Sequence, residues 1–140
     1  MTAEDIPFVS ALDCDVFRTG WTEEQYRGEL EKEFAHYYIA EADGVRVGFA
    51  GVWCIYETAE VSRIAVKRDM RKHGIGGALL SMLIEKARRS GCEKIMLEVR
   101  AGNTPAERLY IRNGFNETAL RRNYYVDGDA LIMTLVLNRL

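Results

Sequence analysis

Apolar residues recur every three or four positions in four segments, and this spacing predicts four helices. The clearest helix is expected from Gly74 to Arg89, because its apolar residues form one stripe and its charged residues lie outside it. Gly91 is expected to stop this helix at its C-terminal end. The other helices are predicted from the cap at residues 2–5 to about 17, from 22 to about 34, and from 103 or 104 to about 113.

Apolar and polar residues alternate in six further segments, and this period of two predicts strands. Asp43-Gly44 and Asp127-Gly128 are expected to form the turns of two hairpins. The predicted strands are His36–Glu41, Val45–Tyr56, Glu60–Val66, Lys94–Arg100, Phe115–Tyr125 and Ala130–Leu137. The order of helices and strands predicts an α/β (α+β) fold in which a mixed sheet carries helices on both faces.

The composition fits one globular domain spanning residues 1–140. The chain is 48% hydrophobic and 29% charged, which excludes a disordered chain, a collagen-like repeat and a coiled-coil rod. No apolar run approaches the roughly 20 residues that cross a bilayer, and the acidic start, Met1–Asp5, is unlike a signal peptide. We therefore expect a cytoplasmic protein that does not bind membranes.

The cysteines and histidines indicate neither a disulfide framework nor a metal site. Cys14, Cys54 and Cys92 are widely spaced and odd in number, and the chain has 2 histidines. We interpret the cysteines as small apolar residues in or near the core of a protein from a reducing compartment. Cys14 is accordingly expected on the inward face of the first helix, together with Ile6, Val9, Leu12 and Val16.

Charge is distributed unevenly between the two halves of the chain. Residues 1–62 hold 13 acidic and 4 basic residues, whereas residues 63–140 hold 8 acidic and 15 basic residues. A basic half in a chain of net charge −2 indicates a localised anionic ligand. The sequence pI near 5.8 lies well below that of a typical nucleic-acid-binding domain, so no direct contact with nucleic acid is expected.

Residues 71–77 form a basic, glycine-rich turn between a predicted strand and the clearest helix, with Lys67 and Arg68 nearby. The first N–H groups of a helix lack acceptors within it and lie at its positive end, so such a turn can bind phosphate. A dinucleotide-binding turn would need glycine where Leu79 stands, and a nucleotide triphosphate loop would need Gly-Lys-Ser/Thr, which is absent. The alternative is a solvated basic loop that binds nothing.

Two longer motifs resemble the GNAT superfamily of N-acetyltransferases. The turn reads R-x-x-G-x-G after the strand ending at Val66, and residues 103–115 match N-x-x-A-x-x-L-Y-x-x-x-G-F at every fixed position. Leu97–Arg100 and Arg121–Tyr125 look like the bacterial ribosomal-protein-alanine N-acetyltransferases, which acetylate the N-terminal alanine of ribosomal protein S18. The resemblance spans about residues 2–138. The superfamily usually begins with a strand before its first helix, whereas this sequence starts almost at the helix cap; either that strand is absent or this start omits it.

The resemblance implies a sheet splayed at its centre and acetyl-CoA as the donor, with no metal. Glu98 would be the base that deprotonates the amine, with Glu60 as a second candidate, and Tyr110 would be the acid that protonates the thiolate. Trp21, Tyr124 and Tyr125 would line the acceptor groove. The donor contacts would be Ile64, Ala65, Val66, Arg71, Lys72, His73, Gly74, Ile75, Gly76, Gly77 and Asn103.

Each candidate also has a purely structural interpretation. Ile64, Val66 and Tyr110 could be core residues, and Glu98 could form only a surface ion pair with Arg100. Residues 121–125 could be a plain strand or a small RNA-binding patch. The acceptor would be the N-terminus of a protein, and ribosomal protein S18 is the leading candidate. The alternatives are a broader N-terminal or small-amine acetyltransferase and a non-catalytic acyl-CoA-binding module. We expect a monomer or weak dimer.

Overall fold

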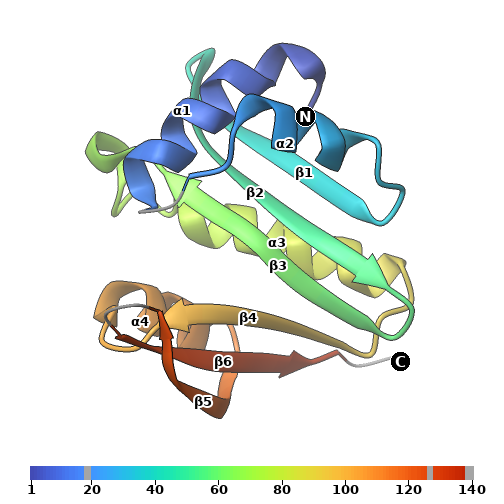
Figure 1. Ribbon diagram of the computed structural model, residues 1–140, viewed down its shortest axis with the longest axis vertical. Coiled ribbons are helices and arrows are strands. Elements are labelled where there is room, and N and C mark those ends of the chain that lie inside the picture. Colours follow the sequence, from blue (N-terminus) through green and yellow to red (C-terminus); the bar gives the residue numbers. More distant parts are fainter. Residues whose placement is uncertain (18–19, 126–127, 138–140) are drawn as a thin grey trace.

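The structure is a computed structural model that describes residues 1–17, 20–125 and 128–137. It is a six-stranded sheet with helices on both faces, which confirms the predicted fold class (Figure 1). The helices are α1 (Ile6–Val16), α2 (Glu23–Leu30), α3 (Ile75–Arg89) and α4 (Thr104–Arg112), with short 3-10 turns at Ala3–Asp5 and Arg68–Met70. The strands are β1 (Ala35–Ala42), β2 (Val45–Ile55), β3 (Thr58–Val66), β4 (Lys94–Arg100), β5 (Asn116–Tyr125) and β6 (Gly128–Val136).

The sheet is splayed at its centre. Its strand order is β1-β2-β3-β4-β6-β5, and β3 runs parallel to β4 while the other neighbours in the described sheet are antiparallel. In the described residues, β3 and β4 pair only from Thr58 with Lys94 to Glu60 with Met96. Beyond that point the two strands diverge, as Figure 1 shows, and the diverging ends lie beside the N-terminus of α3. The predicted central splay is confirmed.

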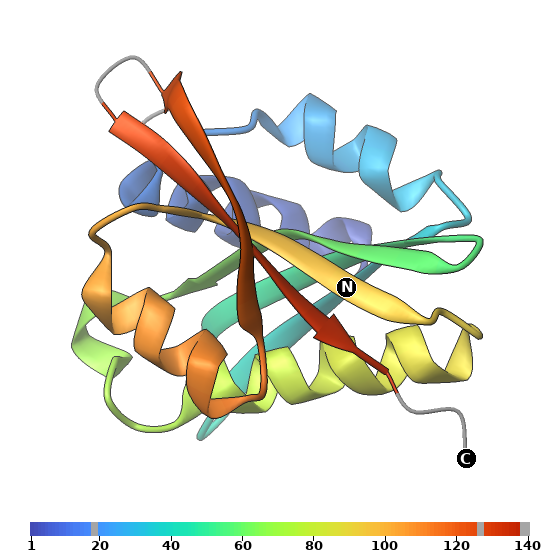
Figure 2. The ribbon, with the colours of Figure 1, turned by 90° about the horizontal axis from the view of Figure 1, so that it is seen from below.

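Each face of the sheet packs against its own pair of helices. The α3–α4 face holds a large apolar core that includes Leu80, Leu83 and Ile95. The α1–α2 face holds a second core around Ile6 and Tyr26. In Figure 2 the two helix pairs lie on opposite sides of the strands. A ligand entering between the diverging strands could therefore reach both faces.

Several boundaries differ from the sequence prediction. The second helix ends at Leu30 rather than near Phe34, because the N–H groups of Glu31 and Lys32 turn back to the carbonyls of Gly28 and Glu29. The predicted strand Glu60–Val66 begins earlier, at Thr58, since the tight connection from β2 needs only residues 56–57. Of the predicted turn Asp127-Gly128, Asp127 lies outside the described residues.

The first helix corrects the prediction for Cys14. Cys14 is exposed, and the charged neighbour Asp13 is fully buried in its place. The burial is possible because the Asp13 carboxylate accepts the Trp21 N–H and pairs with Arg63 at 3.2 Å. Cys54 is half-buried and Cys92 is buried, as expected for near-core and core cysteines.

Candidate active site

The N-terminus of α3 presents a row of backbone N–H groups at the diverging end of β3. Gly74 precedes the helix with a φ of 80°, a left-handed conformation that suits glycine. The Ala78 N–H donates to the Gly74 carbonyl, so the N–H groups of residues 74–77 precede the regular helical hydrogen bonds. A Cβ atom on Gly76 would meet the Leu109 side chain of α4 at 3.4 Å, so this turn lies close to α4. The geometry fits the predicted anion-binding turn.

The basic residues of the turn have different surroundings. The Arg71 Nε donates to the Val66 carbonyl at 3.3 Å and so ties the turn to the end of β3. Lys72 adopts a φ of 67° and, like His73, is exposed. Arg68 pairs instead with Asp15 of α1 at 3.6 Å, so the Asp15 carboxylate partly neutralises the Arg68 charge.

The predicted donor residues on β3 line the separation between β3 and β4. Ile64 and Val66 pack against the α3–α4 core, whereas Ala65 belongs to the α1–α2 core. The core role and the predicted donor role of these residues are compatible, because the side chains pack in the cores while the backbone beyond Glu60 has no partner in the described part of β4. An extended ligand could use that backbone edge as an added strand would.

Asn103 has a structural role at the start of α4. Its side-chain oxygen accepts the Ala106 N–H at 3.4 Å, which makes it the N-cap of that helix. This resolves the predicted choice between Asn103 and Thr104. Asn103 thus lies between the end of β4 at Arg100 and the start of α4 at Thr104.

Glu98 lies on the α1–α2 face of β4, just beyond the last pairing with β3. Its neighbours Leu97 and Val99 are buried on the opposite face. Its side chain is 29% exposed and lies 3.9 Å from the Arg121 guanidinium of β5. Arg100, the partner of Glu98 in the purely structural interpretation, has its guanidinium 4.3 Å from the centre of the Tyr125 ring.

A second carboxylate accompanies Glu98. Glu60 pairs with Met96 in register, so it shares the face on which Glu98 lies two residues further along β4. Burial raises the pKa of Glu60, and the Glu98 carboxylate raises it further, whereas Arg121 acts in the opposite direction. The Glu98 carboxylate therefore acts on Glu60 at the point where the strands separate.

Tyr124 and Tyr125 complete this side of the site from the end of β5. The Glu98 carboxylate raises the pKa of Tyr124, with smaller contributions from burial and hydrogen bonding to Glu98. Burial raises the pKa of Tyr125, and Glu98 adds to the effect. The two rings are in edge contact, 5.2 Å apart, and Arg121 lies over Tyr124. Both predicted acceptor tyrosines thus lie near Glu98.

Tyr110 lies on the opposite face of the sheet from Glu98, on the side of α3 and α4. It is 6% exposed, packs edge-on against Phe115 and is part of the α3–α4 core. Burial raises the pKa of Tyr110 to about 12, so the hydroxyl is protonated at neutral pH. Tyr110 is therefore both a core residue and a potential proton donor.

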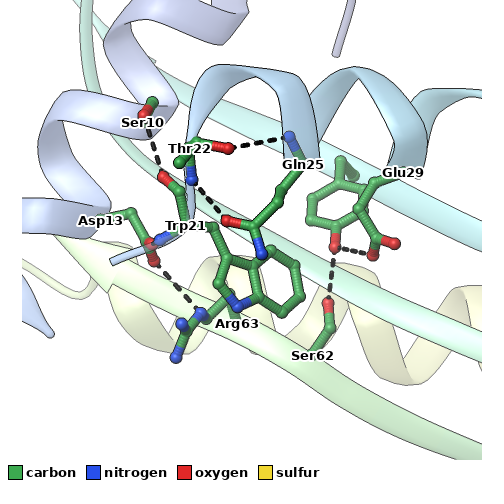
Figure 3. A network of polar contacts seen from close by, with 9 residues as sticks. Ser10, Asp13, Trp21, Thr22, Gln25, Glu29, Ser62 and Arg63 are labelled. Atoms are coloured by element: carbon green, nitrogen blue, oxygen red, sulfur yellow. Dashed lines mark hydrogen bonds and ion pairs between the residues drawn. The ribbon is translucent and has the colours of Figure 1, made fainter. Parts of the chain in front are cut away.

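Trp21 lies directly before the Thr22 cap of α2 (Figure 3) and belongs to an aromatic cluster on the α1–α2 face. Its ring stacks on Trp53 at 6.4 Å, and the Arg63 guanidinium lies 4.7 Å from its centre. The Ser10 hydroxyl donates to the Trp21 carbonyl. The tryptophan is thus held in place from both α1 and β3.

Sequence reasoning missed three charged residues of this face, namely Asp13, Glu29 and Arg63. Asp13 and Glu29 are buried and Arg63 is largely covered. A signal existed for Asp13, which lies four positions after the apolar Val9 on the inward stripe of its helix. Their partners come from distant parts of the chain, so the sequence pattern alone could not identify them.

The described ranges contain neither a cluster of metal-binding side chains nor a helix that could span a membrane. No group of three or more His, Cys, Asp or Glu residues there could hold a metal ion. No helix among residues 1–17, 20–125 and 128–137 is long and apolar enough to cross a membrane.

Several known proteins are similar to this chain in sequence and in fold. The acetyltransferase (GNAT) family pattern matches residues 6–115. A Bacillus subtilis protein, provisionally named a ribosomal protein bS18-alanine N-acetyltransferase, is 35% identical, covering 99% of this chain and 93% of its own length. The crystal structure of the ribosomal-protein-S18-alanine N-acetyltransferase from Escherichia coli superposes with a TM-score of 0.89 at 32% identity, covering 100% of this chain and 92% of that one.

A GNAT family acetyltransferase from Elizabethkingia anophelis with acetyl-CoA bound superposes with a TM-score of 0.73 at 25% identity, covering 83% of this chain and 84% of that one. The family donor is acetyl-CoA. The matches extend over nearly all of the chain and include the turn, the splayed strands and α4. The chain therefore belongs to the GNAT family of acetyltransferases.

Proposed function

We propose that this protein transfers the acetyl group of acetyl-CoA to the N-terminal α-amine of a protein, namely the N-terminal alanine of ribosomal protein S18. The observation that carries the proposal is the position of Glu98. It lies beside Tyr124 where β3 and β4 separate, on the face opposite the α4 tyrosine. The similarity to S18-alanine N-acetyltransferases of two bacteria supports the choice of acceptor.

The donor would bind along one continuous edge of the molecule. Its pyrophosphate would accept hydrogen bonds from the backbone N–H groups of residues 74–77, which precede the first helical hydrogen bond from Ala78. Its pantetheine arm would lie along the β3 backbone between Ile64 and Val66. Arg71 joins the turn to the Val66 carbonyl. It would therefore hold the pyrophosphate-binding turn in a fixed position relative to the β3 backbone that binds the pantetheine arm.

The acceptor would enter from the α1–α2 face, between Trp21 and the paired tyrosines of β5. Glu98 would take a proton from the α-ammonium, directly or through water, and the amine would then attack the thioester carbon. As the new C–N bond forms and the C–S bond breaks, Tyr110 would donate its proton to the leaving thiolate, and the nitrogen would release its second proton to solvent, from which Tyr110 would regain one. Its pKa of about 12 keeps that proton available at neutral pH.

The energetics favour an α-amine over a lysine side chain. A typical α-amine has a pKa near 8, so its deprotonation at pH 7 costs about 1.4 kcal/mol, whereas a lysine with a pKa near 10.4 costs about 4.6 kcal/mol. One carboxylate that is partly exposed to water is an adequate base for the easier reaction.

The predicted single domain over residues 1–140 remains part of this proposal, supported by one sheet whose strands run from Ala35 to Val136.

The proposal is tested with peptides of matched sequence. The protein is incubated with labelled acetyl-CoA and an S18-like peptide that begins with alanine and contains one internal lysine, and the product is mapped by mass spectrometry. We expect acetylation of the α-amine and no product when the N-terminus is blocked. Equal labelling of the lysine in the blocked peptide would contradict the N-terminal assignment.

A further inference from the structure

Glu29 is a buried carboxylate that the proposed chemistry does not use. Its side chain is 4% exposed at the end of α2, where it accepts hydrogen bonds from Lys32 at 2.5 Å and from the Trp53 indole at 2.7 Å. Burial by itself raises the pKa of Glu29, but hydrogen bonds from Lys32, Tyr37 and Trp53 outweigh it, so the pKa lies below its ordinary value. Glu29 is therefore ionised at neutral pH.

Glu29 begins a hydrogen-bonded chain that reaches β3 (Figure 3). The Tyr37 hydroxyl donates to the Glu29 carboxylate at 2.5 Å, and the Ser62 hydroxyl donates to the Tyr37 oxygen at 3.0 Å. An ionised carboxylate only accepts, so Tyr37 must donate to it and must accept from Ser62. The direction of every hydrogen bond in the chain is thus fixed.

The sequence makes room for this chain at Gly51. Tyr37 of β1 faces Gly51 of β2, and Gly51 faces Arg63 of β3. A Cβ atom on Gly51 would lie 2.2–2.6 Å from three atoms of the Tyr37 ring, which no real contact allows. The missing side chain lets the tyrosine ring lie across β2 and reach the third strand.

Ser62 is the extra residue of a β-bulge. The register between β2 and β3 pairs Gly51 with Arg63 but Val52 with Val61, so Ser62 is left without a paired residue on β2. The bulge lies two residues after Glu60, the last β3 residue that pairs with β4 in the described sheet. It therefore sets the direction of residues 63–66, which form the β3 side of the separation.

We propose that Glu29, Tyr37 and Ser62 are positioning residues for acetyl transfer: their hydrogen-bonded chain fixes the bulge and with it the β3 backbone along which the pantetheine arm lies. They touch neither substrate, and they act through residues 63–66. The identity of the donor rests on the proposed function, while the hydrogen-bonded chain and the bulge do not.

The test separates the arm of the donor from its phosphates. The variants are Tyr37→Phe and Ser62→Ala, which each remove one hydroxyl, and the control is Tyr38→Phe on the same strand. Tyr38 packs against the α3–α4 core, on the opposite face from Tyr37. Calorimetry measures the affinity of each variant for acetyl-CoA and for adenosine 3′,5′-bisphosphate, which lacks the arm, and thermal unfolding checks the fold.

We expect both variants to bind acetyl-CoA about five- to tenfold more weakly, the effect of one hydrogen bond, and to bind the bisphosphate as the wild type does. The double variant should lose no more than either single variant, because one chain is broken in each case. The Tyr38→Phe control should match the wild type for both ligands.

Wild-type affinity for acetyl-CoA in both folded variants would overturn the proposal, and so would an equal loss for both ligands, which a merely structural role predicts. If Tyr37→Phe does not fold, Ser62→Ala decides the question, because it leaves the ring packing intact. The binding assay needs no acceptor, so failure to acetylate the S18-like peptide leaves this test in force. A wild-type protein that binds no acetyl-CoA would overturn both proposals.

Discussion

The two faces of the sheet are built in different ways. The α3–α4 face is an apolar core, and the proposed donor site beside it would use backbone groups from one local turn. The α1–α2 face contains the buried polar residues of the described part of the chain, namely Ser10, Asp13 and Glu29, and each bonds to a residue from a distant segment. The first design suits a donor common to a whole family, whereas the second can vary with the acceptor.

The largest effect expected is the loss of the base on the α1–α2 face. Glu98→Gln keeps the shape of the side chain but removes the proton acceptor, so kcat should fall by about 10²–10⁴-fold. The loss should shrink as the pH rises from 6 to 9, because the α-amine then deprotonates without help. Acetyl-CoA affinity, measured separately, should be unchanged.

Glu60→Gln is the matched control for Glu98→Gln, since it changes the neighbouring carboxylate in the same way. We expect it to keep the activity within about tenfold of the wild type. If Glu60→Gln loses the activity while Glu98→Gln keeps it across pH 6–9, the base is Glu60 and the assignment of Glu98 is wrong.

Tyr110→Phe tests the contribution of the α3–α4 face to the chemistry. It preserves the ring in the core and removes the proton donor, so kcat should fall toward the lower end of the same range, about 10²-fold. Because burial raises the pKa of Tyr110 to about 12, the hydroxyl stays protonated throughout pH 6–9 and the defect should not change with pH. A thioester with a better thiol leaving group should reduce it; near-wild-type turnover would remove the role.

Gly76→Asp tests whether donor binding depends on the local turn. The new carboxylate would lie where the pyrophosphate meets the helix N–H groups, and two like charges about 4 Å apart repel by about 4 kcal/mol at the edge of a protein. Calorimetry should show acetyl-CoA binding weakened by roughly 100-fold or more. Gly76→Asn, which adds the same bulk without charge, should lose much less. Equal losses in the two variants would indicate that bulk rather than charge is responsible.

The contrast between the faces also explains what the sequence revealed. The helix order, the helix that follows the glycine-rich turn and the helical position of Tyr110 follow from short-range periodicity and from one contiguous motif, and the structure confirms these predictions. Asp13 with Arg63 and Glu29 with Trp53 are 50 and 24 residues apart. Such pairs depend on tertiary packing, and a buried charge contradicts the apolar pattern that predicts burial.

The alternative, purely structural interpretation of Glu98 paired it with Arg100, two positions along the same strand. The structure places Arg121 beside Glu98 instead, because β5 and β6 fold back against β4 and bring a distant arginine to it. Knowledge of the strand pairing would have been needed to predict this contact.

The smallest effect is expected for Glu29→Gln, which should change the free energy of unfolding and its dependence on pH. Because the pKa of Glu29 is lowered in the folded protein, its stabilising contribution is complete above the ordinary carboxyl value of about 4.3 and is lost as the pH falls through the lower folded-state value. Glu29→Gln should therefore cost about 1.5–3 kcal/mol in the free energy of unfolding at pH 7, and the difference from the wild type should narrow in acid.

The control for this comparison is Glu85→Gln on α3, where the ion pair with Arg89 is exposed. It should change the free energy of unfolding by about 0.5 kcal/mol or less. Urea unfolding at several pH values measures both variants. A Glu29→Gln protein with wild-type stability at pH 7 would show that the buried network does not stabilise the α1–α2 face.

The most direct test of the account joins the two substrates. A conjugate in which CoA is linked through an acetyl bridge to the α-amine of an alanine-first S18 peptide would occupy both faces through the separation between β3 and β4. Calorimetry should show that it binds at least about 100-fold more tightly than CoA alone, because the second half binds at high effective concentration. A conjugate linked through a lysine side chain, with the N-terminus blocked, should bind like CoA. Equal affinity of the two conjugates, or an α-amine conjugate that binds no better than CoA, would contradict a site that joins an acetyl-CoA edge to a protein N-terminus.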